Sequence, residues 1–424
     1  MHPNIMLVKA LLENSLVGVE RALAEKAHLD QNENLDVLDQ PITVNLGVAQ
    51  KDSLITELLK NTNPEEVDQQ TDLLLLCIEQ GLCQSVEAFL SHGIKPDFIS
   101  ADGFSLIHRA IVYGNTESIL LLVKAGVSLT KPIPKLGSPF IFAVVTDRVS
   151  LVALFLELGV DVNTATEENV SALHEAAYHG KRAMVEFLIS KGASIDQETD
   201  KGYTPLHLAV HYGHVSVAEA LLSAGASLMV VDNQGLTVFH KAVQQGSKNL
   251  VKLLLKFGAN VHARATDFAY TPLHFAAAEN RAELVYLLLQ QGADVDDVTR
   301  DGVTPLHLAT LHGARESVEL LLYAKANPES RTQNHLTPLH LAARNGDAFI
   351  LTRLLAYNAQ VDVQTTEGHT PLYFAASSGD KSAVKILLNK GAKVDSSSHA
   401  GVTPLQIAEQ KGHKALVKLL TELS

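Results

Sequence analysis

Residues 204–225, TPLHLAVHYGHVSVAEALLSAG, have the pattern of two short helices separated by a glycine. Thr204 suits a helix N-cap, because its hydroxyl can accept from the free N–H groups of the first turn, and Pro205 suits the first helical position. Gly213 interrupts the first helix, and apolar residues recur at helical spacing on both sides of it. Gly225 stands where helices commonly end in the left-handed conformation. The stretch therefore predicts a helix–turn–helix unit.

Variants of the tetrapeptide TPLH recur along the chain at an interval of 33 residues. They begin at Ser105, Ser138, Ser171, Thr204, Thr237, Thr271, Thr304, Thr337, Thr370 and Thr403. One interval, between Thr237 and Thr271, has 34 residues, and we expect a loop within residues 263–273 to absorb the extra one. The glycine that ends the second helix also recurs, except that Lys325 and Asn358 take its place in two copies. Such a period indicates a solenoid of stacked repeats.

The repeat frame continues less regularly toward the N-terminus. Residues 72–104 keep the expected apolar and glycine positions, whereas residues 5–26 and 41–60 have the pattern of degenerate helix pairs without capping residues. We therefore expect eleven regular copies and thirteen in all. Residues 1–71 would form degenerate helical repeats, and residues 72–424 the regular solenoid.

Units of two helices and a hairpin, with TPLH opening the first helix, resemble the ankyrin repeat. The resemblance covers residues 105–424 strongly and implies an all-α repeat solenoid of helix-turn-helix units with β-hairpin loops, about 11 to 13 stacked repeats. It also implies that the imidazole in the fourth position of the tetrapeptide hydrogen-bonds the backbone between adjacent repeats. Seven histidines hold that position: His108, His174, His207, His240, His274, His307 and His340.

Composition excludes several other classes of protein. Apolar residues make up 46% of the 424 residues but aromatic residues only 5%, so the core must consist mainly of small and aliphatic side chains. The formal net charge of −13 argues against a nucleic-acid binder, whose affinity depends on Lys and Arg contacts to phosphate. We recognise no basic leader and no uninterrupted apolar run of membrane-spanning length. The expectation is a cytoplasmic protein without membrane insertion, or one in the host cytosol if it is a secreted bacterial effector.

Catalytic and metal-binding motifs are not expected in this chain. Cys77 and Cys83 lie within one repeat and are interpreted as small core residues. His174 and His179 suggest the zinc motif HExxH, but they are five residues apart instead of four and do not share a helix face. Phosphate-binding, dinucleotide-binding and nucleophile-elbow motifs were not found. We therefore expect no catalytic residue, no metal and no cofactor.

Two copies carry features with more than one interpretation. In the copy that begins at Ser138, Phe140, Ile141 and Phe142 replace small and polar residues, which indicates either a bend in the solenoid or an apolar recognition spot. In the next copy, Asn163 follows Asp-Val, a pattern similar to that hydroxylated by asparaginyl hydroxylases in animal cells. That pattern also prefers a Leu eight residues earlier, where this chain has Phe.

The resemblance places the partner-binding, concave face on the hairpin tips and the exposed ends of the first helices. These positions correspond to the residue before each tetrapeptide and to the residues just before the glycine that ends the first helix, and we expect them to have no packing role. Tyr is favoured at interfaces because it offers a large area, a polar tip and little rotamer entropy. The expected partner-binding residues are Tyr178, His179, Tyr203, His211, Tyr212 and Tyr270, with Tyr113 and Phe104 extending the patch toward the N-terminus.

The leading functional hypothesis is a monomeric, non-catalytic scaffold that binds another protein through its concave face, without nucleic acid. Long arrays of this kind are similar to host-interacting effectors of intracellular bacteria and to eukaryotic adaptors. The alternative is a host-directed bacterial effector or a regulatory subunit whose irregular N-terminal region carries an activity. For the aromatic patch itself, the alternative is an ordinary scatter of surface Tyr and His.

We predict that Lys325→Gly stabilises the chain. A residue with a side chain costs of order 1 kcal/mol in the left-handed conformation that this position requires, and glycine removes that cost. Thermal unfolding should give a higher Tm for the variant than for the wild-type chain. A lower Tm would contradict the assignment.

Overall fold

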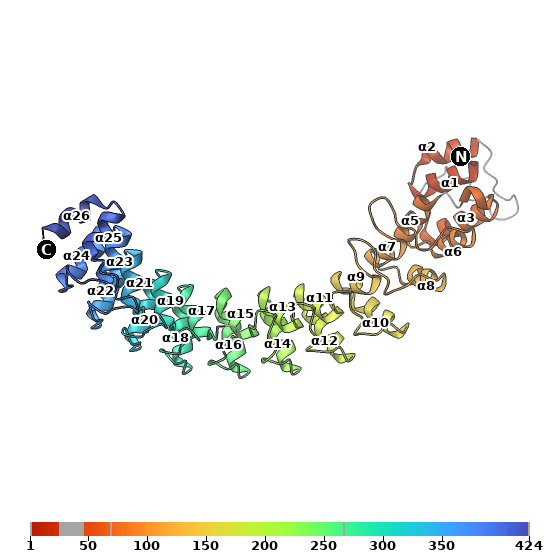
Figure 1. The fold of residues 1–424 in the computed structure, drawn as a ribbon. Coiled ribbons are helices and arrows are strands. Elements are labelled where there is room, and N and C mark those ends of the chain that lie inside the picture. The colour runs from red at the N-terminus through yellow and green to blue at the C-terminus, as the bar shows by residue number, and fades with distance from the viewer. Residues whose placement is uncertain (1, 25–45, 68–69, 266–267, 423–424) are drawn as a thin grey trace. The chain divides into compact units, whose positions relative to one another are not determined.

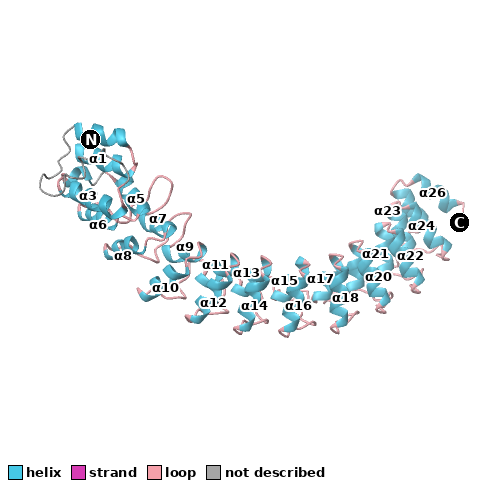
Figure 2. Cartoon of the chain, turned by 180° about the vertical axis from the view of Figure 1, so that it is seen from behind, coloured by secondary structure: helices cyan, strands magenta, loops and turns pink. Residues whose placement is uncertain are grey.

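The computed structural model describes residues 2–24, 46–67, 70–265 and 268–422, and it consists of helices joined by loops (Figure 1). Figure 2 draws helices and loops, and no strand, in the described part of the chain; the hairpins there form isolated bridges such as Ile99 with Ser105. Contacts divide the chain into two compact units, residues 1–194 and 195–424. Each unit is an array of helix pairs.

The first unit contains four irregular N-terminal helices followed by four helix pairs. The N-terminal helices are α1 (Pro3–Leu12), α2 (Leu16–Ala24), α3 (Val48–Lys60) and α4 (Pro64–Val67). The pairs are α5 (Thr71–Gln80) with α6 (Cys83–Ser91), α7 (Leu106–Tyr113) with α8 (Thr116–Lys124), α9 (Pro139–Val145) with α10 (Val149–Glu157), and α11 (Ala172–Tyr178) with α12 (Arg182–Ser190).

The second unit contains seven helix pairs. They are α13 (Pro205–His211) with α14 (Val215–Ser223), α15 (Val238–Gln245) with α16 (Lys248–Lys256), α17 (Pro272–Ala278) with α18 (Ala282–Gln290), α19 (Pro305–Leu311) with α20 (Arg315–Tyr323), α21 (Pro338–Asn345) with α22 (Ala348–Ala356), α23 (Pro371–Ser378) with α24 (Lys381–Asn389), and α25 (Pro404–Gln410) with α26 (Lys414–Thr421). First helices pack on the first helices of adjacent pairs, and second helices such as α18, α20, α22 and α24 pack on one another. The expected solenoid of helix pairs is confirmed.

The N-terminal helices match the sequence expectation only in part. Residues 5–26 do contain a helix pair, α1 and α2, but α3 is one continuous helix from Val48, and residues 41–45 lie outside the described part. The helix is unbroken because no glycine or proline follows Gly47 until its end. α1 packs on α5, and α3 on α6, so both contact the first regular pair. A separate role for residues 1–71 stays a prediction.

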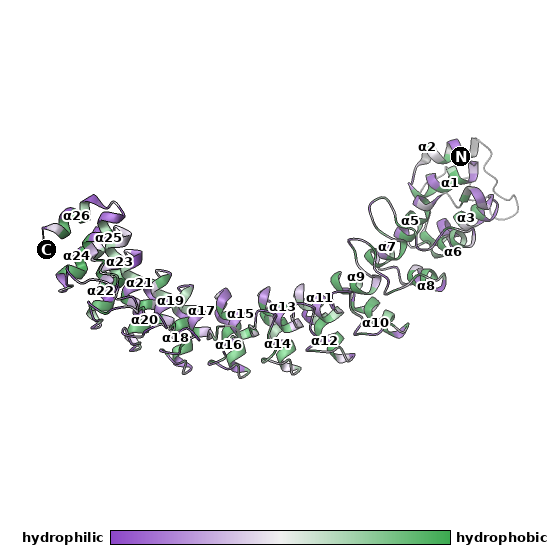
Figure 3. Cartoon of the chain, viewed as in Figure 1, coloured by the Kyte–Doolittle hydropathy of each residue, from purple (hydrophilic) through white to green (hydrophobic). Residues whose placement is uncertain are grey.

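Each helix pair has a thin, mostly aliphatic core. In the pair α13 and α14, Leu206, Ala209, Ala218 and Leu221 are completely buried. Figure 3 shows hydrophobic and hydrophilic residues on the same helices, as in amphipathic helices that pack on both neighbours. The scarcity of aromatic residues follows from this close helix packing.

The unusual phenylalanines of α9 belong to the core. Phe140 is completely buried, and Ile141 and Phe142 are nearly so. The Phe142 ring contacts the His108 ring edge-on, with centroids 5.0 Å apart. An apolar recognition spot made of these side chains is therefore excluded.

Backbone geometry supports the assigned turn positions. Lys325 and Asn358 have φ of 68° and 66°, so both are left-handed at the end of a second helix. The extra residue of the long interval lies in the hairpin. There the N–H of Ala265 donates to the carbonyl of Tyr270, five residues on, whereas other hairpins close over four residues, as from Thr299 to Val303.

Hairpins of adjacent repeats approach one another closely at Gly302. This residue has φ of 75°, and a Cβ there would lie 2.9 Å from the carbonyl oxygen of Arg331 in the next hairpin. Gly401 has a similar φ of 77°, but a Cβ at that position would meet no heavy atom within 4 Å. A side chain at either glycine would strain the backbone, but only a side chain at Gly302 would also collide with the next hairpin.

We predict that Gly302→Ala destabilises the chain more than Gly401→Ala. Both variants lose roughly 1 kcal/mol because alanine is strained at positive φ, and Gly302→Ala must also displace the Arg331 backbone. Chemical denaturation followed by circular dichroism measures both. Equal losses would contradict the close approach of the two hairpins.

Candidate functional site

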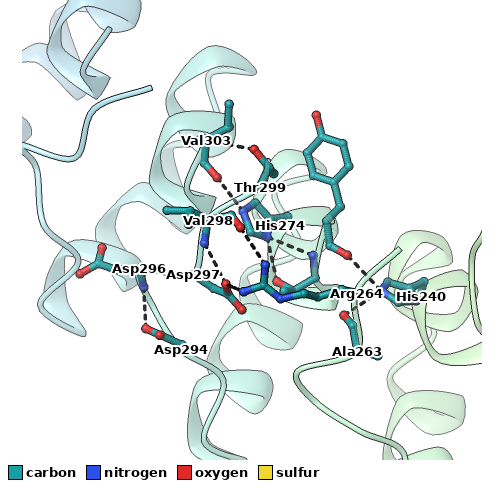
Figure 4. A network of polar contacts seen from close by, with 12 residues as sticks. His240, Ala263, Arg264, His274, Asp294, Asp296, Asp297, Val298, Thr299 and Val303 are labelled. Carbon is teal, nitrogen blue, oxygen red and sulfur yellow. Dashed lines mark hydrogen bonds and ion pairs between the residues drawn. The ribbon is translucent and has the colours of Figure 1, made fainter. Parts of the chain in front are cut away.

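In four repeats of the second unit, the histidine of the tetrapeptide connects its repeat to the next. In the α17 repeat, the N–H of Thr271 donates to Nδ1 of His274 over 3.1 Å, so Nδ1 is an acceptor and the ring proton is on Nε2. Nε2 then donates to the carbonyl of Val303 in the following hairpin, 3.0 Å away (Figure 4). The same interaction joins His240 to Ala263 and Tyr270, His307 to Leu336, and His340 to Val363 and His369.

These imidazoles are buried and neutral. Burial lowers the pKa of five of the seven tetrapeptide histidines to about 4, although the backbone carbonyls beside them oppose this shift: His108, His207, His274, His307 and His340. Where both ring nitrogens have backbone partners, no lone pair remains for a metal. The structural role that the resemblance implied is confirmed for His240, His274, His307 and His340.

Two other groups give no sign of reactive chemistry. Cys77 is completely buried, and burial raises the pKa of its thiol. Burial also raises the pKa of Cys83 to about 11, so its thiolate is scarce at neutral pH. Among the described residues, no group of three or more His, Cys, Asp or Glu side chains is arranged to hold a metal ion.

In the first unit, the expected binding residues lie at the ends of α7 and α11 and in one hairpin. Tyr113 ends α7 with 52% of its surface exposed, and Tyr178 ends α11 with 40% exposed. His179 follows directly, and its ring meets that of Tyr178 edge-on at 4.7 Å. Its Nε2 lies 3.6 Å from the Glu175 carboxylate. Phe104 is half-buried in its hairpin.

In the second unit, the same two helix-end positions hold His211 and Tyr212. Both are exposed, Tyr212 to 46%, and their rings meet edge-on at 4.8 Å. Gln245, at the end of the next first helix, donates through Nε2 to the carbonyl of His211 over 2.7 Å. The aromatic pair is thus anchored to the adjacent repeat and still exposed.

The expectation that the residues before the tetrapeptides have no packing role is wrong. Tyr270 is half-buried, and its ring contacts those of His274 and Phe275 at 5.7 and 5.8 Å. Tyr203 similarly contacts the His207 ring at 6.1 Å. Each hairpin lies against its own first helix, so the residue that joins them packs at the junction.

Phe104 follows the same rule at its own junction. Its ring meets Phe142 edge-on at 6.1 Å and lies under the guanidinium of Arg109 at 5.0 Å. Phe104, Tyr203 and Tyr270 are therefore partly structural. Tyr113, Tyr178, His179, His211 and Tyr212 are the exposed members of the expected set.

Sequence reasoning missed exposed apolar side chains elsewhere. Tyr286 on α18 and Tyr323 on α20 are 57% and 82% exposed, and Phe268 and Met229 are exposed in hairpins. The signal for the two tyrosines was their position on the polar face of a second helix.

It also missed a polar connection between hairpins. The Oδ1 of Asn163 accepts from the N–H of Ser194 over 2.8 Å, and Asp196, Asp296, Glu329 and Asp362 make the same contact to a backbone N–H 31 residues later. The signal was an Asn, Asp or Glu eight residues before a tetrapeptide. Hydroxylation of Asn163 stays a prediction.

Comparison with known proteins supports the resemblance. A family model described as "Ankyrin repeats (3 copies)" matches residues 140–232, 192–265, 239–333 and 339–424, which together exceed half of the chain. The chain is also similar to the B-cell lymphoma 3 protein homolog of Mus musculus, with 29% identity over 181 residues. That match covers 40% of this chain and 40% of the mouse protein, so the aligned part is less than half of either. None of the described helices is long and apolar enough to cross a membrane.

We predict that the array loses stability as the pH falls from about 6.5 toward 4. The buried imidazoles have folded-state pKa values of about 4, below the unfolded value, so in this window the unfolded chain binds more protons. As the pH falls through this window, each histidine lowers the free energy of unfolding by at most about 1.4 kcal/mol per pH unit. Above the window, the stabilising contribution of each histidine is fully present. Thermal unfolding between pH 7.5 and 5 measures the loss.

The variant His307→Gln is the control for this prediction. The last repeat has Gln406 in the same position, where its Oε1 accepts from the N–H of Thr403 over 2.9 Å without titrating. The variant should therefore lose less stability than the wild-type chain over this pH range, because other titrating groups are common to both. An identical pH dependence would contradict a role for the imidazole.

Proposed function

The chain belongs to the ankyrin-repeat family, and we propose that it is a non-catalytic scaffold that binds another protein through its first-helix ends and hairpins. Stacked pairs present these elements repeatedly on one side of each unit, because the first helix of each pair packs on the first helices of adjacent pairs. Such an array supplies an extended binding surface. Monomeric state and cytoplasmic location stay predictions.

The observation that best supports this proposal is an aromatic–imidazole pair at equivalent positions of two repeats. Tyr178 with His179, and His211 with Tyr212, end their first helices with exposed rings in edge-on contact. Edge-on contact between neighbouring rings restricts their motion before binding, which lowers the entropy lost in a complex. Tyr in such positions commonly contributes a large share of the binding free energy.

The protonation states and hydrogen bonds of the buried histidines and of the cysteines favour a binding function over catalysis. His240, His274, His307 and His340 are buried, with both ring nitrogens hydrogen-bonded, and the two cysteines have raised pKa values. General acid–base or nucleophilic catalysis needs such groups to be accessible and poised near neutral pH. The four histidines instead join adjacent repeats.

We predict that the double variant Tyr178→Ala/Tyr212→Ala weakens binding to a protein partner about tenfold or more, as expected when a buried anchor is lost. The partner is first isolated with the wild-type chain, and its affinity for each variant is then measured by calorimetry. Circular dichroism should show an unchanged fold, because both side chains project from the core.

The matched control is Tyr286→Ala/Tyr323→Ala, which removes two exposed tyrosines from second helices. This control should bind the partner as the wild-type chain does. If the helix-end variant keeps full affinity, or if both variants lose it equally, the proposed binding surface is wrong.

A further inference from the structure

Charge is segregated along this acidic chain. The whole sequence has 34 Lys and Arg against 47 Asp and Glu, yet residues 381–424 contain seven lysines and only three carboxylate side chains. All seven lysines are exposed: Lys381, Lys385, Lys390, Lys393, Lys411, Lys414 and Lys418. The last two repeats are therefore basic within a chain of net charge −13.

Four of these lysines occupy a regular arrangement on α24 and α26. Lys381 and Lys385 are four residues apart on α24, as are Lys414 and Lys418 on α26, so each pair shares one helix face. Corresponding members are 33 residues apart and therefore have the same register in consecutive repeats. The two repeats stack through α23 and α25. We call these four residues the lysine face.

In the middle of the second unit, lysines on a second helix have carboxylate partners on adjacent second helices, and one of them, Lys248, holds the position equivalent to Lys381. Lys248 of α16 lies 2.8 Å from the Glu283 carboxylate of α18, and Lys256 lies 3.9 Å from that of Glu219 on α14. The four residues of the lysine face instead form no ion pair within 4 Å with any residue that the structure describes.

The acidic residues near the lysine face do not neutralise it. Asp380 caps α24, and its Oδ1 accepts from the N–H of Ala383 over 2.6 Å. In the described part of residues 381–424, Asp395, Glu409 and Glu422 form no ion pair within 4 Å. The face is thus an uncompensated positive surface on the second helices.

We propose that the lysine face binds an acidic helix of a protein partner whose carboxylates are spaced at i and i+4. That spacing equals the spacing of the lysines within each pair, so one acidic helix lying along α24 or α26 matches both charges. This surface lies on second helices, and it is independent of the first-helix surface proposed above.

Two other polyanions fit the surface less well. No exposed large apolar residue lies between residues 381 and 422, so the face lacks the apolar anchor that holds a helix on a lipid surface. Residues 381–424 also contain neither Arg nor an aromatic residue, the side chains that read base edges and stack on bases. An acidic protein segment requires neither.

The test uses the full chain and three probes. These are a helical peptide with Glu at i, i+4 and i+8, vesicles containing phosphatidylserine, and a short DNA duplex. At about 0.15 M salt, where the screening length is about 8 Å, the peptide should bind and the vesicles and duplex should bind at least about tenfold more weakly. Tighter binding of the vesicles or of the duplex would overturn the proposal.

Two charge-reversal variants distinguish binding by the lysine face from an effect of the total charge. The variant Lys381→Glu/Lys385→Glu/Lys414→Glu/Lys418→Glu should lose peptide binding by about tenfold or more. The control Lys124→Glu/Lys131→Glu/Lys201→Glu/Lys325→Glu changes the total charge equally at scattered exposed lysines and should bind within about threefold of the wild-type chain. Equal losses in both variants would show a net-charge effect and overturn the proposal. Both variants should keep the helical circular dichroism of the wild-type chain.

Discussion

The structure depends on the contact between each helix pair and the next. A single pair of short helices cannot bury both of its apolar faces, so its stability comes from its neighbours. In the second unit this contact has a polar part as well, in which a neutral histidine accepts from its own N-cap residue and donates to the following hairpin. One side chain thereby caps a helix and joins two repeats.

The residues needed for stacking determine which surfaces remain available for binding. The apolar residues, the capping residues and the buried histidines are needed for contacts within and between repeats. Positions such as Gly302 are restricted because adjacent hairpins approach closely there. The ends of the first helices and the outer sides of the second helices are then free to vary. The exposed tyrosine and histidine pairs lie at the ends of first helices, and the lysine face lies on second helices.

Much of the fold could be predicted because stacking imposes a strict period. The N-cap Thr and the left-handed positions at Lys325 and Asn358 followed from residue type and spacing, and the structural role of the histidines followed from the resemblance to the ankyrin repeat. The packing of Tyr203 and Tyr270 could not be predicted, since it depends on how each hairpin lies against its helix. The single helix α3 was missed because the repeat frame has no capping residues there. The candidate site was therefore predicted by position, but its exposed and packed members were separated only by the structure.

The central claim, that neutral histidines hold adjacent repeats together, is tested most directly by nitrogen NMR of the imidazoles in the folded chain. His274, His307 and His340 should each show the neutral tautomer with the proton on Nε2, and should keep it from pH 7 down to about pH 5, because their pKa values are about 4. Titration of these rings near pH 6.5, or a proton on Nδ1 at neutral pH, would contradict the account.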